Sequence, residues 1–342
     1  MELSVFFAGT AGSVPSARRG LPALLVRRGA ERILIDCGEG TQRQLVRSVG
    51  LADLTDIFIT HLHADHWLGL PGMLKSFDLR DRDRPLHVYG PPGLTDLMEA
   101  MRRQVFGRLG YELTIEELRP GEAIRRDELQ IHPFAVRHRG TAYGYALVED
   151  DRPGRFDADL AARLGVRPGP DFGRLQRGEV VGGVRPDQVI GPPRQGRKVV
   201  VSGDTGPSET LALVTHQADL LVHEATFGED EADRARQTGH STARQAASVA
   251  RDAEVRLLAL THLSSRYAGP EIRDEARAVF PATVVPRDFD LVEIPFPERG
   301  APVLVRHQDR PRPAAPPGPG PGLEPDAGLP EAEAVADPAA IS

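Results

Sequence analysis

The chain has 342 residues, of which 40% are hydrophobic and 27% charged, and this balance excludes a disordered or fibrous protein. The length fits two average domains or one large α/β domain. The formal net charge is −7, but the segment from Asp309 onward contributes −4 and the rest −3, so the average does not exclude a nucleic-acid partner.

The amino terminus lacks the basic and apolar segments of a signal peptide, and no later stretch approaches the ~20 apolar residues of a membrane helix. We therefore expect a cytoplasmic protein with no membrane partner. Cys37 is the only cysteine, which excludes intrachain disulfides and a cysteine-rich zinc site. Any bound metal has to be held by histidines and carboxylates.

Short apolar runs alternate with Gly/Pro turns and helical stretches over residues 1 to about 300, which predicts a layered α/β domain. The predicted strands cover residues 3–8, 23–27, 32–36, 56–60, 86–89, 129–136, 142–148, 198–202, 220–223 and 256–261. The predicted helices cover residues 41–49, 93–105, 207–216, 241–253 and 269–279.

Two segments break this alternation. Residues 150–197 are rich in Gly, Pro, Arg and Asp, and only residues 158–164 have a helical pattern, so we predict an insertion that leaves the domain. Residues 309–342 form a Pro/Ala-rich acidic tail with too few large apolar residues to fold, and we predict that it is disordered.

The clearest chemical signal is His61-Leu62-His63-Ala64-Asp65-His66, directly after the apolar run at 57–60. Four potential ligands in six residues cannot all face one way on a strand, so this segment is expected to be a loop that wraps around a bound group. Imidazole nitrogens and a carboxylate are what Zn²⁺ accepts where thiolates are absent. The alternative is a solvated, histidine-rich turn.

Three further candidates repeat this arrangement, because His138, Asp204 and His262 each follow a predicted strand. Loops beyond the strand ends of an α/β sheet converge on one edge, where sites form. Taken singly, His138 or His262 is more often an ordinary loop histidine. Together with the loop at 61–66 they supply five His and two Asp, enough for two metal ions that share one carboxylate.

This ligand pattern resembles the metallo-β-lactamase superfamily, and the flanking motifs resemble one family within it, the ribonuclease Z endonucleases that process tRNA 3′ ends. The likeness covers about residues 1 to 300. It rests on Phe7-Ala8-Gly9-Thr10 with Pro15, Asp36-Cys37-Gly38-Glu39-Gly40-Thr41-Gln42, Gly69-Leu70-Pro71-Gly72, Ser202-Gly203-Asp204-Thr205, His223-Glu224-Ala225-Thr226, His240-Ser241-Thr242 and Thr261-His262-Leu263-Ser264-Ser265-Arg266-Tyr267.

The resemblance implies a catalytic domain at residues 1–300 with the metallo-β-lactamase fold, an α/β class in which two mixed sheets flanked by helices form an αββα sandwich. It also implies a homodimer, precursor tRNA as substrate and two Zn²⁺ ions per chain. On the family pattern His61, His63 and His138 hold one ion, Asp65, His66 and His262 hold the other, and Asp204 bridges them.

Cutting a phosphodiester requires a nucleophile, neutralisation of charge on the phosphate, and a proton for the leaving 3′ oxygen. A zinc pair supplies the first two, and Asp65 is a candidate to orient the nucleophile and take its proton. The resemblance implies that His240 protonates the leaving oxygen and that Glu224 orients His240. The plainer alternatives are a helix-start residue for His240 and a buried salt-bridge partner for Glu224.

The resemblance also assigns residues 150–197 to a flexible arm that holds the body of the tRNA. Arginines are the side chains expected to contact phosphate there, although acidic neighbours dilute their charge. The candidates are Arg152, Arg155, Arg163, Arg167, Arg174 and Arg177 in the arm, and Arg266 near the metal ligands. A surface insertion without RNA contact is the alternative.

These observations predict an endoribonuclease that removes the 3′ trailer from precursor tRNA, leaving a 3′ hydroxyl on the tRNA and a 5′ phosphate on the trailer. One rival is a phosphodiesterase or arylsulfatase-like enzyme acting on small esters, which the arm and the His240/Glu224 pair oppose. Another is a catalytically idle RNA-binding module, which the complete ligand set opposes.

Overall fold

A computed structural model describes residues 1–51 and 53–309 of the chain. Apart from Asp309, the predicted disordered tail at 309–342 lies outside these residues. Within the described part, no helix has both the length and the apolar character needed to cross a bilayer.

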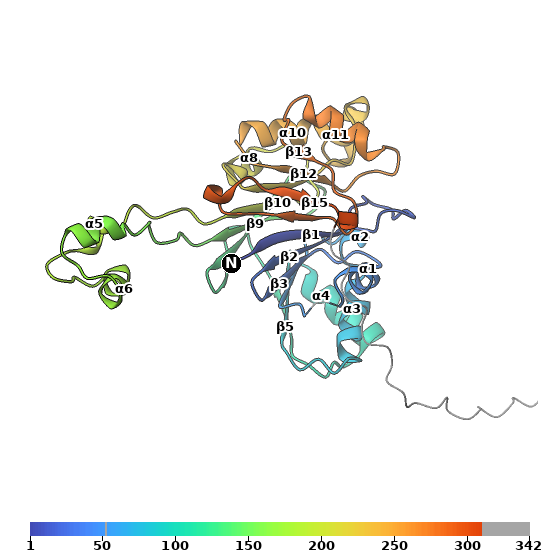
Figure 1. Cartoon of the computed structure of the whole chain (residues 1–342). Coiled ribbons are helices and arrows are strands. Elements are labelled where there is room, and N and C mark those ends of the chain that lie inside the picture. Colours follow the sequence, from blue (N-terminus) through green and yellow to red (C-terminus); the bar gives the residue numbers. More distant parts are fainter. Residues whose placement is uncertain (52, 310–342) are drawn as a thin grey trace, which may run out of the picture. The chain divides into compact units, whose positions relative to one another are not determined.

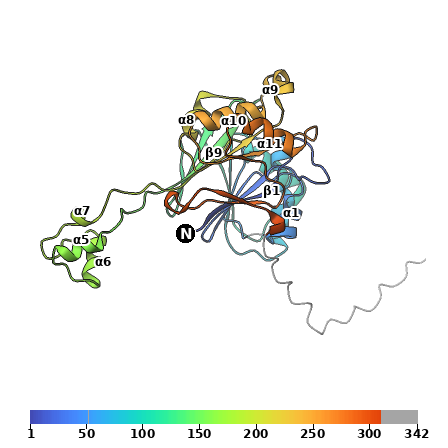
Figure 2. The ribbon, with the colours of Figure 1, turned by 45° about the horizontal axis from the view of Figure 1, so that its top comes forward.

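Two sheets form the centre of the domain at residues 1–309 (Figures 1 and 2). Among the described residues, the first has eight strands in the order β15-β14-β1-β2-β3-β4-β5-β6 and the second has seven in the order β13-β12-β11-β10-β9-β8-β7. Both sheets contain parallel and antiparallel pairs. The strands of the first sheet are β1 (Leu3–Gly9), β2 (Ala23–Arg28), β3 (Glu31–Ile35), β4 (Asp56–Phe58), β5 (Leu86–Gly90), β6 (Leu113–Glu117), β14 (Leu291–Glu293) and β15 (Val303–Val305). Those of the second are β7 (Ile124–Arg126), β8 (Leu129–Ala135), β9 (Tyr143–Glu149), β10 (Lys198–Val201), β11 (Leu220–Glu224), β12 (Leu258–Thr261) and β13 (Thr283–Val284).

Helices cover the outer face of each sheet. Phe6 and Phe7 on β1 illustrate the layers, because successive side chains of a strand point to opposite faces. Phe7 belongs to the apolar core between the sheets, whereas Phe6 belongs to the core beneath the helices of the first sheet. These helices are α1 (Thr41–Ser48), α3 (Leu70–Asp78) and α4 (Leu94–Met101), and those against the second sheet include α8 (Glu209–Thr215), α10 (Ala243–Asp252) and α11 (Gly269–Arg277). The predicted αββα sandwich is confirmed.

The predicted strands are all present, with ends moved by at most two residues. The predicted helix at 93–105 ends at Met101 and continues as a π-helical turn, Arg102–Phe106. Helix α3 was missed because Gly69-Leu70-Pro71-Gly72 has the composition of a turn, yet Pro71 lies in the first helical turn, where its missing N–H costs nothing. Strands of two or three residues, such as β7 and β13, were missed because they are too short to show a period.

The arm leaves the second sheet after β9 and returns to it at β10 (Figure 1). The prediction of a single helical stretch was incomplete, because α5 (Ala158–Arg163) is joined by α6 (Pro170–Gln176) and α7 (Pro186–Val189). These short helices enclose a small apolar core of their own, made of Ala161, Val166, Leu175, Val181, Val184 and Val189. The predicted boundary at residue 197 is too wide, since Arg197 is buried in the domain against Glu149.

Candidate metal centre

The candidate ligands lie where strands of the two sheets end. The segment after β4 carries the residues at 61–66 and passes into the short helix α2 (Ala64–Trp67). Trp67 Nε1 donates to the carbonyl of Leu62 at 3.2 Å, which closes this loop on itself. His138, Asp204 and His262 follow β8, β10 and β12, so strands from both sheets supply one site.

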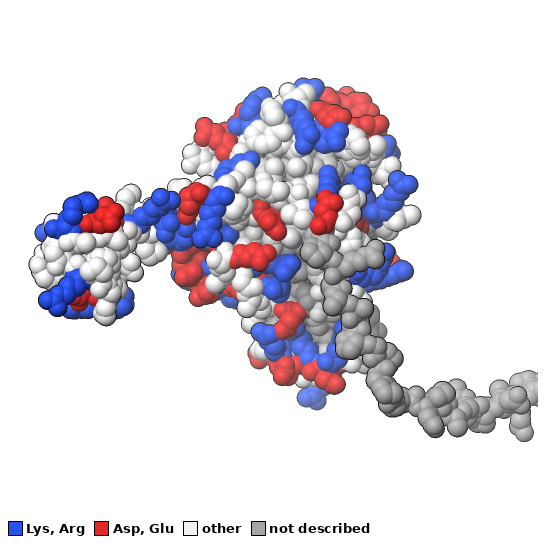
Figure 3. Space-filling view, in the orientation of Figure 1, with Lys and Arg blue, Asp and Glu red and all other residues white. Residues whose placement is uncertain are grey.

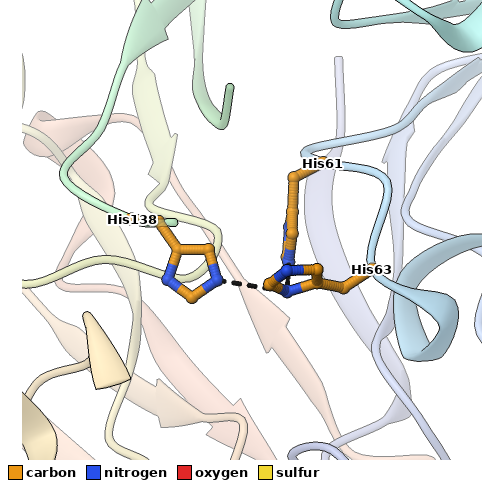
Figure 4. Close-up of side chains that lie close together, drawn as sticks. All are labelled: His61, His63 and His138. Atoms are coloured by element: carbon orange, nitrogen blue, oxygen red, sulfur yellow. Dashed lines mark hydrogen bonds between the residues drawn. The ribbon is translucent and has the colours of Figure 1, made fainter. Parts of the chain in front are cut away.

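His61, His63 and His138 form the first group, and one nitrogen of each lies within 4.8 Å of the others. Figure 4 shows the three rings converging from two segments. His61 Nε2 lies 2.9 Å and His138 Nε2 3.2 Å from His63 Nδ1. A tetrahedral zinc with bonds of about 2.0 Å separates its ligand nitrogens by about 3.3 Å, so the spacing suits one ion. The other ring nitrogen of His138, Nδ1, lies 2.8 Å from the carbonyl oxygen of Gly239, which fixes the ring.

Asp65, His66 and His262 form the second group. Asp65 Oδ2 lies 3.5 Å from His66 Nε2 and 3.4 Å from His262 Nε2. Asp204 stands between the two groups, since its Oδ2 is 3.4 Å from His66 Nε2, 3.2 Å from His262 Nε2 and 3.8 Å from His61 Nε2. The structure thus brings together all seven residues that the sequence singled out as ligands.

Hydrogen bonds on the outer ring nitrogens orient His66 and His262. His66 Nδ1 lies 2.8 Å from Asp36 Oδ2, and His262 Nδ1 lies 2.9 Å from Thr226 Oγ1. These contacts leave each Nε2 facing the cluster, and both Nε2 atoms are buried without a hydrogen-bond partner among the described residues. Two orphaned imidazole nitrogens beside two carboxylates are the donor set expected around a divalent cation, so the residues fit a zinc site.

Burial and neighbouring charges shift the pKa values of two ligand candidates, His61 and Asp204. Burial, reinforced by the neighbouring His66, lowers the pKa of His61 to about 2, so this imidazole stays in the neutral form that binds metal. Burial opposes ionisation of Asp204, but positive charge on the His262 and His66 rings outweighs it and holds the pKa of that carboxyl well below its usual range. A buried, ionised carboxylate is costly unless a positive group compensates it.

Glu224, at the end of β11, is buried and uses both carboxylate oxygens. Oε1 accepts from the Thr205 amide at 2.9 Å and lies 2.8 Å from His240 Nδ1. Oε2 accepts from the amide of Thr226 at 3.0 Å and from its hydroxyl at 2.7 Å. His240 Nδ1 is also 3.9 Å from Asp204 Oδ2, so the pair lies beside the metal ligands, as predicted.

Burial lowers the pKa of His240, but the Glu224 carboxylate outweighs this effect and raises it to about 9. The imidazole is therefore protonated at neutral pH and able to act as an acid. Thr242 caps α10, and its side chain accepts from the amide of Gln245, so His240 stands just before a capped helix.

Two residues that orient the site were assigned no role from the sequence. Asp36 lies directly after β3 and accepts from the Thr60 amide at 2.8 Å as well as contacting His66. Its position at a strand end is the signal that could have identified it. Thr226 connects Glu224 to His262 through one hydroxyl. A hydroxyl two residues from a candidate carboxylate is too common a pattern to have indicated this link.

A cavity of about 270 Å³ opens beside His240 and is lined by Arg137 and Arg236 as well. Neither arginine was predicted as a substrate contact. Arg266, which was predicted, lies in the loop after β12 and forms an ion pair with Glu231 at 2.7 Å.

The predicted arm arginines differ in whether they form ion pairs within the protein. Arg174 and Arg177 pair with Glu179, at 2.8 and 3.5 Å. Three others are exposed and form no ion pair within the described part of the chain; they are Arg155, Arg163 and Arg167. Figure 3 shows basic groups on the arm and along its connection to the domain. Arg152 is not free, since it binds Glu298 at 2.8 Å.

Comparisons with known proteins agree with this geometry. The family described as the metallo-beta-lactamase superfamily matches residues 22–262. Ribonuclease Z of Haloferax volcanii is 47% identical over 305 residues, covering 86% of this chain and 96% of that protein. Ribonuclease Z of Myxococcus xanthus is 47% identical over 270 residues, covering 78% and 88%. The crystal structure of the short form of human tRNase Z superposes with a TM-score of 0.64 at 28% identity, covering 85% of this chain and 99% of that one.

Proposed function

Because the chain belongs to the ribonuclease Z family of the metallo-β-lactamase superfamily, we propose that it removes the 3′ trailer from precursor tRNA as a zinc-dependent endoribonuclease. The observation that carries the proposal is the position of Asp204, which faces both groups of candidate ligands while the Glu224–His240 pair adjoins them. The products are a tRNA with a 3′ hydroxyl and a trailer with a 5′ phosphate.

We infer two Zn²⁺ ions: His61, His63 and His138 would hold one, Asp65, His66 and His262 would hold the other, and the Asp204 carboxylate lies between the two groups. Bound there, the metals would supply a nucleophile at neutral pH and neutralisation of phosphate charge. Asp65 is suited to orient that nucleophile and to accept its proton, because the Ser13 amide holds Oδ2 at 3.0 Å beside both His66 and His262.

His240 is the proton donor to the departing 3′ oxygen in this proposal. Its Nδ1 is held by Glu224, so Nε2 is the atom that can face substrate. Glu224 acts through His240, because both of its oxygens are occupied inside the protein. A proton delivered in the transition state is worth about 10²–10⁴ in rate.

The substrate reaches beyond the metal centre, and the arm is the proposed second contact. The exposed Arg155, Arg163 and Arg167 are free to contact phosphates of the tRNA body, and Arg266 lies nearer the metal ligands. Family membership further supports a homodimer, and a cytoplasmic location is proposed with this function. Sedimentation of the purified protein tests the dimer.

A single comparison tests the proposal. The zinc-loaded protein is incubated with a 3′-extended precursor tRNA and, separately, with bis(p-nitrophenyl) phosphate. We expect one cut in the tRNA, with a product that accepts ligation at its 3′ hydroxyl, and slower turnover of the small ester. Rapid ester hydrolysis without tRNA cleavage would favour the small-ester phosphodiesterase, and binding without any cleavage would favour the idle RNA-binding module.

A further inference from the structure

The arm joins the domain through two antiparallel chain segments that pair at isolated bridges beyond β9 and β10, at Arg152–Arg194 and again at Phe156–Ile190. The Arg152 amide donates to the Arg194 carbonyl at 2.8 Å, and the Arg194 amide donates back at 2.9 Å. Isolated bridges between only two segments leave the stem able to bend, since two strands alone are marginal in water. If the arm keeps a fixed orientation relative to the domain, another element has to hold the stem.

Phe296, in the segment after β14, contacts the stem from the side of the domain. The guanidinium carbon of Arg152 lies 3.5 Å from the centroid of the Phe296 ring, and that of Arg197 lies 4.0 Å from it. Guanidinium groups this close to an aromatic ring are attracted by its π face. The ring therefore links the outgoing segment of the arm to the residue at which the arm re-enters the domain.

Glu298 binds both segments of the stem at once. Its Oε1 accepts from Arg152 at 2.8 Å and from Arg194 at 3.1 Å, and its Oε2 accepts from Arg152 at 3.2 Å. These charge-assisted bonds, led by that of Arg152, lower the pKa of Glu298 to about 2. The carboxylate is thus ionised and shared across the physiological pH range.

Arg197 connects these contacts to the interior. It is buried, and its guanidinium binds both oxygens of Glu149 at 2.7 Å. It also donates to the Ile294 carbonyl at 2.8 Å and to the Met1 carbonyl at 3.0 Å. Side chains of the domain therefore hold the stem in addition to the backbone pairing that continues from β9 and β10.

We propose that Phe296 and Glu298 are positioning residues, which fix the direction of the arm at its root and so set where the tRNA body lies relative to the metal centre. This inference rests on the proposed function, because it needs the arm to hold tRNA. An arm that pivots freely has to be ordered when substrate binds, and the apparent affinity falls with the fraction of arms in the competent direction. The chemical step is untouched, since neither side chain contacts the site.

The kinetic test compares Phe296→Ala and Glu298→Gln with the parent enzyme. We expect KM for precursor tRNA to rise by about tenfold in Phe296→Ala, with kcat and the turnover of bis(p-nitrophenyl) phosphate unchanged. Phe296→Tyr keeps the aromatic face and should restore the parent KM, whereas Phe296→Leu keeps only apolar volume and should not. Unchanged KM in both Phe296→Ala and Glu298→Gln overturns the inference.

A second measurement follows the arm itself. Cys37 is buried, so spin labels can be directed to introduced cysteines at Gln176→Cys in α6 and at Leu213→Cys in α8, both exposed positions. We expect a narrow distance distribution in the parent and a broad one in Phe296→Ala. Glu179→Gln, which removes an ion pair within the arm but not at its root, is the matched control and should stay narrow. An unchanged distance distribution in Phe296→Ala overturns the inference. If the parent protein does not cleave precursor tRNA, the proposed function is overturned instead.

Discussion

The metal centre and the arm are held in position by different kinds of contact. At the centre, the candidate ligands follow buried strands of two sheets, and neighbouring side chains fix His66, His262 and His240. The arm has three short helices around a small apolar core of its own, and an aromatic ring and a carboxylate hold its root. Position is thus set by strands of the core in one region and by a few side-chain contacts at the root in the other, so substitutions should separate chemistry from binding.

The largest effect is expected at Asp204, because its carboxylate faces both groups of ligands. In Asp204→Ala the zinc content should fall from about two ions per chain, the number a two-metal site requires, and turnover of precursor tRNA and of the small ester should both drop to background. Elemental analysis and the two assays check this. Asp204→Asn is the matched variant, since it keeps the shape and removes the charge, and full activity in either variant contradicts a shared ligand.

The next effect concerns the proton donor. His240→Ala and Glu224→Ala should each lower kcat by about 10²–10⁴ with little change in tRNA affinity, because they act on the leaving oxygen alone. The double variant should be scarcely worse than His240→Ala, since the 2.8 Å contact makes the two residues one unit. Single-turnover rates on precursor tRNA give the comparison. Additive losses would show that Glu224 acts independently of His240.

The centre and the existence of the arm were largely predictable from the sequence, whereas the internal structure of the arm and the contacts at its root were not, for a physical reason. The ligand segments follow apolar runs that are long enough to indicate buried strands. Because the ends of such strands lie at one edge of a sheet, the ligand side chains are predicted to lie close together. Asp36 shares that signal at the end of β3, and only its role had to come from the contact with His66.

The root of the arm depends instead on contacts that no local pattern contains. Arg152 and Glu298 are 146 positions apart, and Phe296 lies in a segment of the C-terminal part of the domain that resembles an ordinary turn. The helices α6 and α7 are short and begin with proline, so composition indicates loop while the apolar side chains still form a core. Tertiary contacts decide such segments, and sequence periodicity does not report them.

Removing the arm tests the separation of binding from chemistry directly. Because Arg152, Arg194 and Arg197 belong to the contacts at the root, the deletion should replace residues 154–193 with a short Gly/Ser loop and keep all three. We expect the zinc content and small-ester turnover to persist, and precursor tRNA affinity to fall by about 10²-fold at moderate salt. Titrations across a salt series should also show a flatter slope. Equal affinity and slope would mean that the arm is a passive surface insertion.

The smallest effects distinguish arginines within the arm. Arg163 is exposed and forms no ion pair within the described residues, whereas Arg174 is already paired with Glu179 at 2.8 Å. A guanidinium that contacts phosphate releases counterions, so Arg163→Ala should weaken tRNA binding and reduce the salt slope by about one. Arg174→Ala should change the slope less, because its charge is partly neutralised before tRNA arrives. Glu179→Gln should act in the opposite direction and strengthen binding at low salt, since it frees Arg177 and leaves Arg174 with only its longer contact to Asp171. Equal slopes for Arg163→Ala and Arg174→Ala would show that pairing inside the arm does not decide which arginines contact the tRNA.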